Sequence, residues 1–188
     1  MRSGELYNGA GTGLNAHLDD CQVEVQRINA IPYERSDERR AALEALLGGY
    51  GPGSFIRPPF YCDFGDGITI GRDVFINSNC TMLDTGPITI GDECLLATQV
   101  QLVTATHPVD PGVRRAAWEY SRPVVLGDGV WLGAGVIVCP GVTIGDNSVI
   151  GAGAVVTRDI PPGVVAYGNP ARVIRDIGEQ DRVEPPSR

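Results

Sequence analysis

The chain has 188 residues, 43% of them hydrophobic, so it is long enough to bury a sizeable core and most simply forms one domain. The formal net charge of −8 at pH 7 argues against general nucleic-acid binding, which requires a clustered basic surface. No stretch approaches the roughly 20 apolar residues that span a bilayer, and the N-terminus lacks an apolar signal segment. We therefore expect a cytoplasmic protein.

Two residue types limit the chemistry. All 15 basic residues are arginine, so any bound anion must be met by guanidinium groups or by backbone N–H. The cysteines are odd in number, widely spaced and without a CxxC pair, which is typical of small buried residues in a reducing compartment. They do not indicate a metal site. The five are Cys21, Cys62, Cys80, Cys94 and Cys139.

Residues 1–57 are expected to form a helical cap. Apolar residues recur there at alternating spacings of four and three, which places them on one face of a first helix. These residues are Leu14, Leu18, Cys21, Val25 and Ile28. A second helix is predicted to begin with Ser36 as its N-cap and to stop at Gly48-Gly49. His17 lies within the first helix and is expected to be a surface or packing residue.

The middle of the chain has a period of six. An aliphatic residue appears every six positions at Leu126, Leu132, Val138, Ile144, Ile150 and Val156. The next position is small, usually glycine, and the fourth position after each aliphatic is small or apolar. The same phase occurs earlier at Phe64, Ile70, Ile76 and Met82, slips by two residues at DTGP, and resumes at Ile90, Leu96 and Leu102.

A period of six fits neither a helix of 3.6 residues per turn nor a series of hairpins. It fits a solenoid of short strands joined by tight turns, in which three hexapeptides make a coil of about 18 residues. We expect this β-helix over residues 58–160, with two coils between residue 70 and an extruded loop, residues 108–121, and two coils after it. Residues 161–188 form a C-terminal segment that is expected to be loosely ordered from Asp176.

Four stretches carry a more specific signal: GELY, CDFGDGITIG, TATHPVDP and PGVTIGDNSVIGAGAVVTRDIPPGVVAYGNPARVIR. Over roughly residues 4–177 the chain resembles the hexapeptide-repeat acyltransferases, and among them the maltose/galactoside O-acetyltransferase group. The resemblance implies a mainly β fold, a left-handed parallel β-helix with an N-terminal helical segment and one extruded loop. It also implies an acetyl-CoA-dependent O-acetyltransferase that acts on a sugar hydroxyl, and a homotrimer with active sites between subunits.

His107, in TATHPVDP, stands where the repeat gives way to the extruded loop. Its position alone is compatible with a loop-entry residue held by backbone groups. An imidazole also suits a general base, because it can take a proton from an alcohol as that alcohol attacks a thioester. The catalytic base of the family is the histidine of this motif, so the resemblance predicts His107 as the base and the loop as a wall of its site.

Contacts to acetyl-CoA are implied by the resemblance at Ala134, Ala152, Thr157, Arg158, Arg172 and Arg175. A tight turn that needs a small residue explains Ala134 equally well, and its backbone N–H is also suited to a thioester oxygen. The family often has lysine at the position of Arg158. Arg172 and Arg175 would be ordinary solvated charges on their own. They suit the phosphates of the cofactor, and they would share a face if the segment were helical.

Four residues are candidates for the acceptor side. Asn77 occupies a family position beside the acceptor hydroxyl, although asparagine also suits a β-helix corner because it tolerates left-handed backbone angles. Asp63 and Asp84 fall at or next to family acceptor positions, and Glu119 lies in the extruded loop. Each of the three carboxylates is a candidate for binding sugar hydroxyls or for orienting the histidine.

Two departures from the family bear on the acceptor. Galactoside-type members carry aspartate at the positions of Gly9 and Thr85, so this chain lacks two hydroxyl-binding carboxylates and a galactoside acceptor is less favoured. Serine and antibiotic acetyltransferases share the fold and remain alternatives, as does a non-catalytic β-helix assembly protein. A β-helical carbonic anhydrase is set aside, because it binds metal through three histidines and this chain has two.

Overall fold

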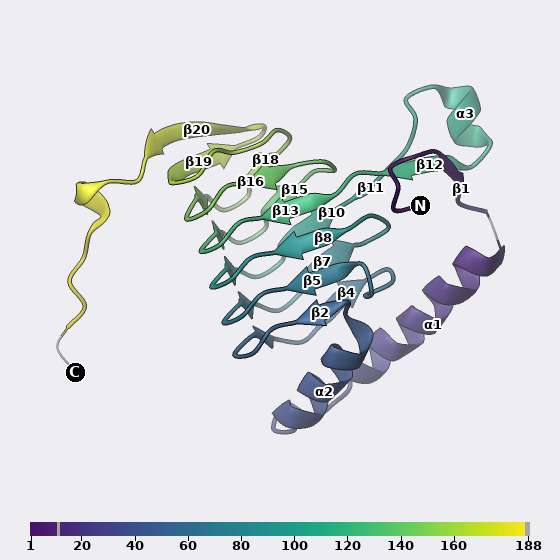
Figure 1. Cartoon of the computed structure of the whole chain (residues 1–188), viewed down its shortest axis with the longest axis horizontal. Helices are drawn as coiled ribbons and strands as arrows, with labels where there is room; N and C mark the ends of the chain where they lie inside the picture. The colour runs from purple at the N-terminus through teal and green to yellow at the C-terminus, as the bar shows by residue number, and fades with distance from the viewer. Residues whose placement is uncertain (11, 187–188) are drawn as a thin grey trace.

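A computed structural model describes residues 1–10 and 12–186 of the protein. Two helices lead into a solenoid of short parallel strands, and a strand and tail leave its far end (Figure 1). The helices are α1 (Thr12–Asn29), α2 (Ser36–Leu46), α3 (Pro111–Arg115) and the 3-10 helix η1 (Glu179–Asp181). Among the described residues, no helix is both long and apolar enough to cross a membrane.

Three sheets form the faces of the solenoid, and the chain visits them in the order face one, face two, face three. Face one consists of β2 (Gly49–Tyr50), β5 (Ile68–Ile70), β8 (Ile88–Ile90), β13 (Val124–Leu126) and β16 (Thr143–Ile144). Face two consists of β3 (Phe55–Ile56), β6 (Phe75–Ile76), β9 (Leu95–Leu96), β14 (Trp131–Leu132), β17 (Val149–Ile150), β19 (Val164–Gly168) and the antiparallel β20 (Ala171–Asp176). Face three consists of β4 (Phe60–Cys62), β7 (Cys80–Leu83), β10 (Gln101–Val103), β15 (Ile137–Val138) and β18 (Val155–Val156).

The six-residue period marks the interior of the solenoid. The aliphatic residues of the repeat are at most 2% exposed, and Val130, Val136 and Ala154, four positions after them, are fully buried. Each buried valine, leucine or isoleucine side chain contributes about 1.5–3 kcal/mol of burial free energy. A glycine that follows such an aliphatic residue lies where the backbone of the next coil comes closest to it. A Cβ on Gly127, for example, would lie 2.0 Å from Asp146 Oδ1. The prediction of a mainly β solenoid is confirmed.

The solenoid is longer than predicted at both ends. Its parallel ladder begins with Gly49 beside Thr69, inside the segment expected to be cap, and extends to β19, beyond residue 160. Neighbouring rungs are 20 residues apart before the extruded loop (Phe55 beside Phe75), 18 apart after it (Trp131 beside Val149) and 16 apart at the last rung (Val149 beside Val165). The longer coils explain the two-residue slip at DTGP, since the extra residues lie at one corner of the solenoid.

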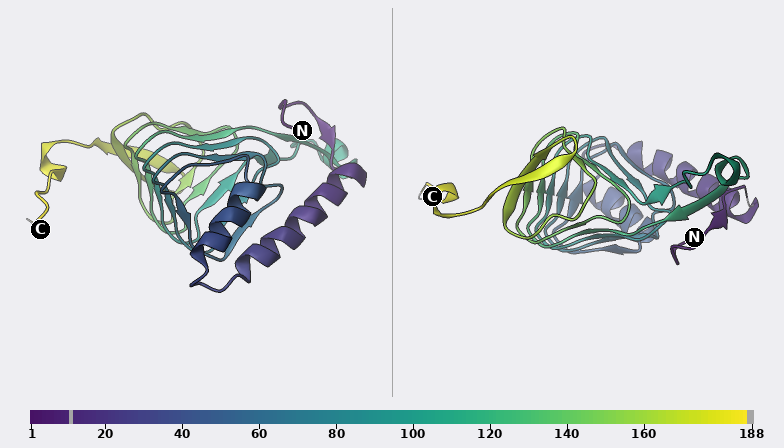
Figure 2. Two further views of the ribbon diagram at one scale, coloured as in Figure 1. Left: turned by 60° about the horizontal axis from the view of Figure 1, so that its bottom comes forward. Right: turned by 90° about the horizontal axis from the view of Figure 1, so that it is seen from above.

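The N-terminal helices cover the first coil. Helix α2 lies across its open end and α1 runs alongside (Figure 2). The predicted face of α1 is confirmed, since Cys21, Val25 and Ile28 are buried. The prediction that Ser36 caps α2 is wrong, because Ser36 is its first helical residue and Arg35 holds the cap position.

The extruded loop is not irregular. It contains α3, whose N-cap Asp110 accepts hydrogen bonds from Gly112 N and Val113 N at 2.7 and 3.0 Å. It then returns as β12 (Trp118–Ser121), the central strand of a small antiparallel sheet. The neighbours of β12 are β11 (Ala105–Thr106) and β1 (Tyr7–Asn8), from the very start of the chain. The loop is therefore anchored by residues more than a hundred positions away.

The C-terminal segment corrects one local expectation. Arg172 and Arg175 lie on β20, not on a helix. Residues three apart on a regular strand would point to opposite faces, but the register shifts by one residue between Val165 and Ala166. Arg172 therefore pairs with Tyr167, and Arg175 pairs with Val165, which lies on the same side of β19. The bulge gives the two arginines the common face that a helix was expected to supply.

Candidate active site

A row of three side chains crosses the small antiparallel sheet at the base of the extruded loop. Tyr7 on β1 lies directly opposite Glu119 on β12. On the other side of β12, Thr106 pairs with Tyr120, so the next residue, His107, comes opposite Glu119. Directly opposed residues of antiparallel strands have adjacent side chains. The order across the row is therefore Tyr7, Glu119, His107, with the carboxylate in the middle.

The distances in this row are short. The Tyr7 hydroxyl donates a hydrogen bond to Glu119 Oε2 at 3.0 Å, and Glu119 Oε1 lies 4.0 Å from Nδ1 of His107. The histidine side chain is 54% exposed, whereas the glutamate is only 27% exposed. Because Nδ1 faces the carboxylate, Nε2 is the ring nitrogen left for an incoming substrate.

A cavity of about 200 Å³ adjoins this row. Its lining includes Tyr7, Asp63, Thr85 and Glu119, so it presents carboxylates and hydroxyls, and Phe64 adds an apolar wall. Burial, followed by the charges of Asp84 and Glu119, raises the pKa of Asp63 to about 6. Such a lining can bind several hydroxyl groups of one small molecule.

Asp84 does not line this cavity, and its carboxylate is not accessible to a bound molecule. It is fully buried, and its two carboxylate oxygens accept hydrogen bonds from the backbone N–H of Asp63, Phe64 and Gly67 at 2.9 to 3.1 Å. A carboxylate bonded in this way is closed to a sugar hydroxyl. The expected acceptor contact is therefore corrected: Asp84 shapes the turn that carries Asp63.

The raised pKa of Asp63 predicts a pH-dependent cost to stability. Because the folded pKa of about 6 lies above the ordinary value of 3.8, the folded state holds this proton more tightly, and stability falls as pH rises between the two values. Asp63→Asn should raise the free energy of unfolding by about 1 kcal/mol at pH 8 after allowance for solvent screening. Urea unfolding at pH 8 and pH 4.5 checks this, and equal gains at the two pH values would contradict it.

The structure changes the meaning of the two family departures. A Cβ built on Gly9 would lie 2.5 Å from Glu119 Oε1, so the Glu119 carboxylate occupies the space of a side chain at position 9. Thr85 lines the same cavity and bonds Thr104 through its hydroxyl at 3.2 Å. The carboxylate beside position 9 therefore comes from the extruded loop and not from the N-terminal segment.

Sequence reasoning missed Tyr7 as a site residue. The hydrogen bond joins residues 112 positions apart, and no periodicity relates them. The available signal was the GELY motif, in which Tyr7 is the last residue.

The remaining candidates occupy other edges of the solenoid. Asn77 lies at the corner between faces two and three, and its Oδ1 accepts a hydrogen bond from Ser78 N at 2.9 Å. The left-handed backbone expected for it is instead found at Asn79, with φ of 63°. Ala134 and Ala152 stack at the same corner, where Gly153 N–H donates to Ala134 O at 2.8 Å. Both alanines are exposed.

Thr157 and Arg158 follow β18 and lie exposed at the corner between faces three and one, which is also the corner of His107. They are two rungs further along, or roughly 10 Å at the spacing of neighbouring strands. Arg172 and Arg175 lie on the strand that ends face two. Arg175 donates two hydrogen bonds to Asp181, each 2.7 Å long, which lower the pKa of that carboxyl to about 2.

The candidate residues therefore do not meet within one chain. Asn77 and His107 lie at opposite ends of the strands of face three, which are as long as four residues in β7, or roughly 13 Å. Face two, which carries Arg172 and Arg175, is the side of the triangular prism opposite the corner of His107. Figure 1 shows the C-terminal strand and the extruded loop on opposite sides of the solenoid.

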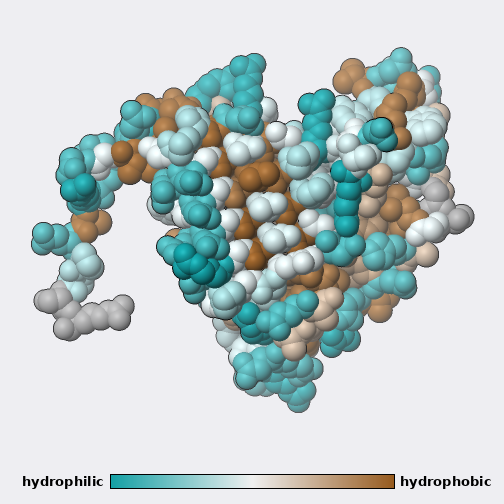
Figure 3. Space-filling model, in the orientation of Figure 1, coloured by the Kyte–Doolittle hydropathy of each residue, from teal (hydrophilic) through white to brown (hydrophobic). Residues whose placement is uncertain are grey.

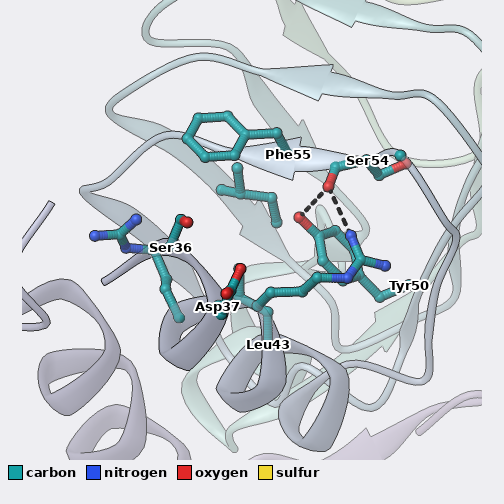
Figure 4. Close-up of a pocket in the computed structure, with 10 residues that line it drawn as sticks. Ser36, Asp37, Leu43, Tyr50, Ser54 and Phe55 are labelled. Carbon is teal, nitrogen blue, oxygen red and sulfur yellow. Dashed lines mark hydrogen bonds between the residues drawn. The ribbon is translucent and has the colours of Figure 1, made fainter. Parts of the chain in front are cut away.

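A second cavity, of about 230 Å³, lies where α2 meets the first coil (Figure 4). The Ser54 carbonyl there accepts hydrogen bonds from the Tyr50 hydroxyl at 2.9 Å and from Arg40 at 3.0 Å. None of the candidate site residues lines it. The bond from Arg40 ties α2 to the solenoid.

Family models match three parts of the chain: "Maltose acetyltransferase hexapeptide capping motif" over residues 1–51, "Hexapeptide repeat of succinyl-transferase" over 67–100 and "Bacterial transferase hexapeptide (six repeats)" over 123–158. Nodulation protein L of Rhizobium meliloti is 46% identical, over 92% of this chain and 94% of its own. Galactoside O-acetyltransferase of Escherichia coli is 39% identical, over 97% of this chain and 90% of its own.

Two solved structures are similar throughout. A galactoside acetyltransferase in complex with coenzyme A superposes with a TM-score of 0.92 at 39% identity, over 96% of this chain and 90% of that one. A maltose O-acetyltransferase from Clostridium difficile also gives 0.92, at 43% identity and over 95% of both chains. On this likeness of sequence and fold, the chain belongs to the hexapeptide-repeat acetyltransferases of the maltose and galactoside O-acetyltransferase group.

Proposed function

We propose that the protein is an acetyl-CoA-dependent O-acetyltransferase that acetylates a sugar hydroxyl, with His107 as the general base. The observation that carries this proposal is the position of His107, half exposed, 4.0 Å from Glu119 and beside a cavity lined with carboxylates and hydroxyls. Relatives named as galactoside and maltose O-acetyltransferases, one of them solved with coenzyme A, support it.

In this mechanism His107 Nε2 takes the proton of the acceptor hydroxyl while the hydroxyl oxygen attacks the thioester carbonyl. The C–S bond of the tetrahedral intermediate then breaks, and the imidazolium returns the proton to the sulfur of coenzyme A. An acyl-cysteine intermediate is not favoured. Cys80 is buried, and burial raises its thiol pKa to about 11, so little nucleophilic thiolate forms at neutral pH.

We place each complete site between two copies of the chain in a homotrimer. The division of the candidates between two corners supports this, because a second copy can bring its Asn77 corner to the His107 corner of the first. The outward row of face two is apolar along its length and includes Leu95, 48% exposed, and Trp131, 51% exposed. Figure 3 views the solenoid from the neighbouring face one (β2, β5, β8, β13 and β16), where apolar residues also run down the solenoid. Exposed apolar rows of this kind favour association.

Acetyl-CoA fits a groove between two such copies. Ala134 and Ala152 are exposed, and their backbone N–H groups make no hydrogen bond to any residue that the structure describes. A Cβ on Gly135 or Gly153 would meet nothing within 4 Å, so this corner is open. The backbone donors suit the thioester oxygen and the amides of the pantetheine arm, and Thr157, Arg158, Arg172 and Arg175 suit its phosphates.

Asp181 competes with this phosphate role, because it already holds Arg175 through two hydrogen bonds. Asp181→Asn removes the negative charge and is expected to lower the Kd for coenzyme A by about twofold to fivefold, as a surface ion pair of modest strength is lost. Calorimetric titration checks this. A weaker affinity in the variant would show that the ion pair orders Arg175 for binding instead of blocking it.

The function is tested by thiol release from acetyl-CoA with maltose, glucose, galactosides, serine and chloramphenicol as acceptors. Turnover on a sugar, with none on serine or chloramphenicol, is the expected result. Turnover on serine or chloramphenicol alone would replace the proposed acceptor class. If no acceptor supports turnover and calorimetry detects no coenzyme A binding, the chain is a non-catalytic scaffold.

A further inference from the structure

Tyr7 lines the cavity of the candidate site, but the proposed mechanism gives it no role. It lies on β1, directly opposite Glu119. Burial, then the hydrogen bond to Glu119, raises the pKa of its hydroxyl to about 12, so the phenol keeps its proton at neutral pH and can donate it to Glu119. A permanent donor fixes the carboxylate oxygen that it binds.

Glu119 needs such a restraint because several groups face it. His107 lies next to Oε1, Tyr7 next to Oε2, and the charge of Asp63 acts on the same cavity. A glutamate side chain with free rotamers would swing between the histidine, the cavity and solvent. With Oε2 held at 3.0 Å by Tyr7, Oε1 stays directed toward Nδ1.

We infer that Tyr7 is a positioning residue, which aims Glu119 at His107 and so fixes the imidazole tautomer with the proton on Nδ1 and the lone pair on Nε2. The inference rests on the proposed function, in which His107 Nε2 is the base. It makes the first strand of the chain a working part of the site, because the side chain of Tyr7 on β1 holds Glu119 of the extruded loop by a hydrogen bond.

The direct readout is the tautomer of His107, from the nitrogen-15 shifts of its ring. The chain has two histidines, so His17 serves as an internal reference in the same spectrum. Tyr7→Phe removes one hydroxyl and keeps the ring. We expect the neutral His107 of the wild type to be mainly Nδ1-protonated, and Tyr7→Phe to move it toward a mixture while the His17 signals stay unchanged.

Turnover gives the second readout. Tyr7→Phe is expected to lower kcat by about tenfold with the KM for acetyl-CoA unchanged, which is the usual effect of one hydrogen bond to a charged group. Tyr120→Phe is the matched control, because it removes a hydroxyl from the adjacent residue of β12, whose side chain points to the opposite face of the sheet. It should change neither readout.

Two further variants test whether Tyr7 acts through Glu119. In the Glu119→Ala background, Tyr7→Phe should cause no further loss of kcat. Gly9→Ala, whose Cβ would lie 2.5 Å from Glu119 Oε1, should displace the carboxylate and change the tautomer with Tyr7 intact. It also serves if Tyr7→Phe does not fold.

An unchanged His107 tautomer in both Tyr7→Phe and Gly9→Ala overturns the inference. A tenfold loss of kcat when Tyr7→Phe is added to the Glu119→Ala variant also overturns it. The tautomer is measured without any substrate. A failure of the proposed function, seen as full activity in a His107 variant, therefore remains distinct from a failure of this inference.

Discussion

His107→Ala is expected to lower kcat by about 10²–10⁴-fold while the affinity for coenzyme A is retained, which is the usual effect of removing a general base. Without the imidazole the acceptor alcohol must lose its proton to water during attack, whereas the proposed backbone and arginine contacts to the cofactor do not involve His107. Single-turnover thiol release measures the chemical step, and calorimetry measures coenzyme A binding to the same sample.

His17→Ala is the matched control, because the two histidine side chains are equally exposed, at 54%. His17 stacks on Phe64 with ring centroids 5.4 Å apart and lies 3.8 Å from Asp66, on the cap. Its loss should leave kcat within about twofold of wild type. Near-wild-type turnover in His107→Ala, or an equal loss in His17→Ala, would remove His107 from the mechanism.

The repeat made the fold predictable because a solenoid is specified locally. Each coil needs only an aliphatic residue inside and a small residue where the next coil approaches, and both positions are visible in the sequence, as at Leu126 and Gly127. The cap boundary was misplaced because Gly49 and Phe55 begin rungs in a stretch without the full six-residue pattern.

The site was only partly predictable, because its central row is formed by pairing across the chain. His107 could be found from its motif, but its neighbours follow from strand register, which no local pattern encodes. The same applies to Glu119, which fills the space at Gly9, and to the β-bulge that aligns Arg172 with Arg175. The role of Asp84 was misjudged because the sequence does not distinguish an aspartate that accepts hydrogen bonds from backbone N–H groups from one that binds a sugar.

Mixing two impaired variants is expected to restore activity if each site is shared between copies. Asn77→Ala should lower kcat by about 10²-fold, on the scale of removing one preorganised polar contact to the reacting atoms. When His107→Ala and Asn77→Ala chains are co-expressed, about a quarter of the sites in a randomly assembled closed trimer combine an intact His107 with an intact Asn77. Activity should rise to about a quarter of wild type.

The control for this rescue uses two residues of the same corner. His107 and Glu119 lie 4.0 Å apart in one chain, so each site takes both residues from the same copy. In this mixture every site therefore lacks either the histidine or the glutamate. Co-expression of His107→Ala with Glu119→Ala should therefore give no more than the mean of the two separate activities. Rescue in the first mixture and none in the second would place Asn77 and His107 on different copies at each site. Absence of rescue in both mixtures, with light scattering showing a monomer, would require a site built from one corner alone, in which Asn77 has no part.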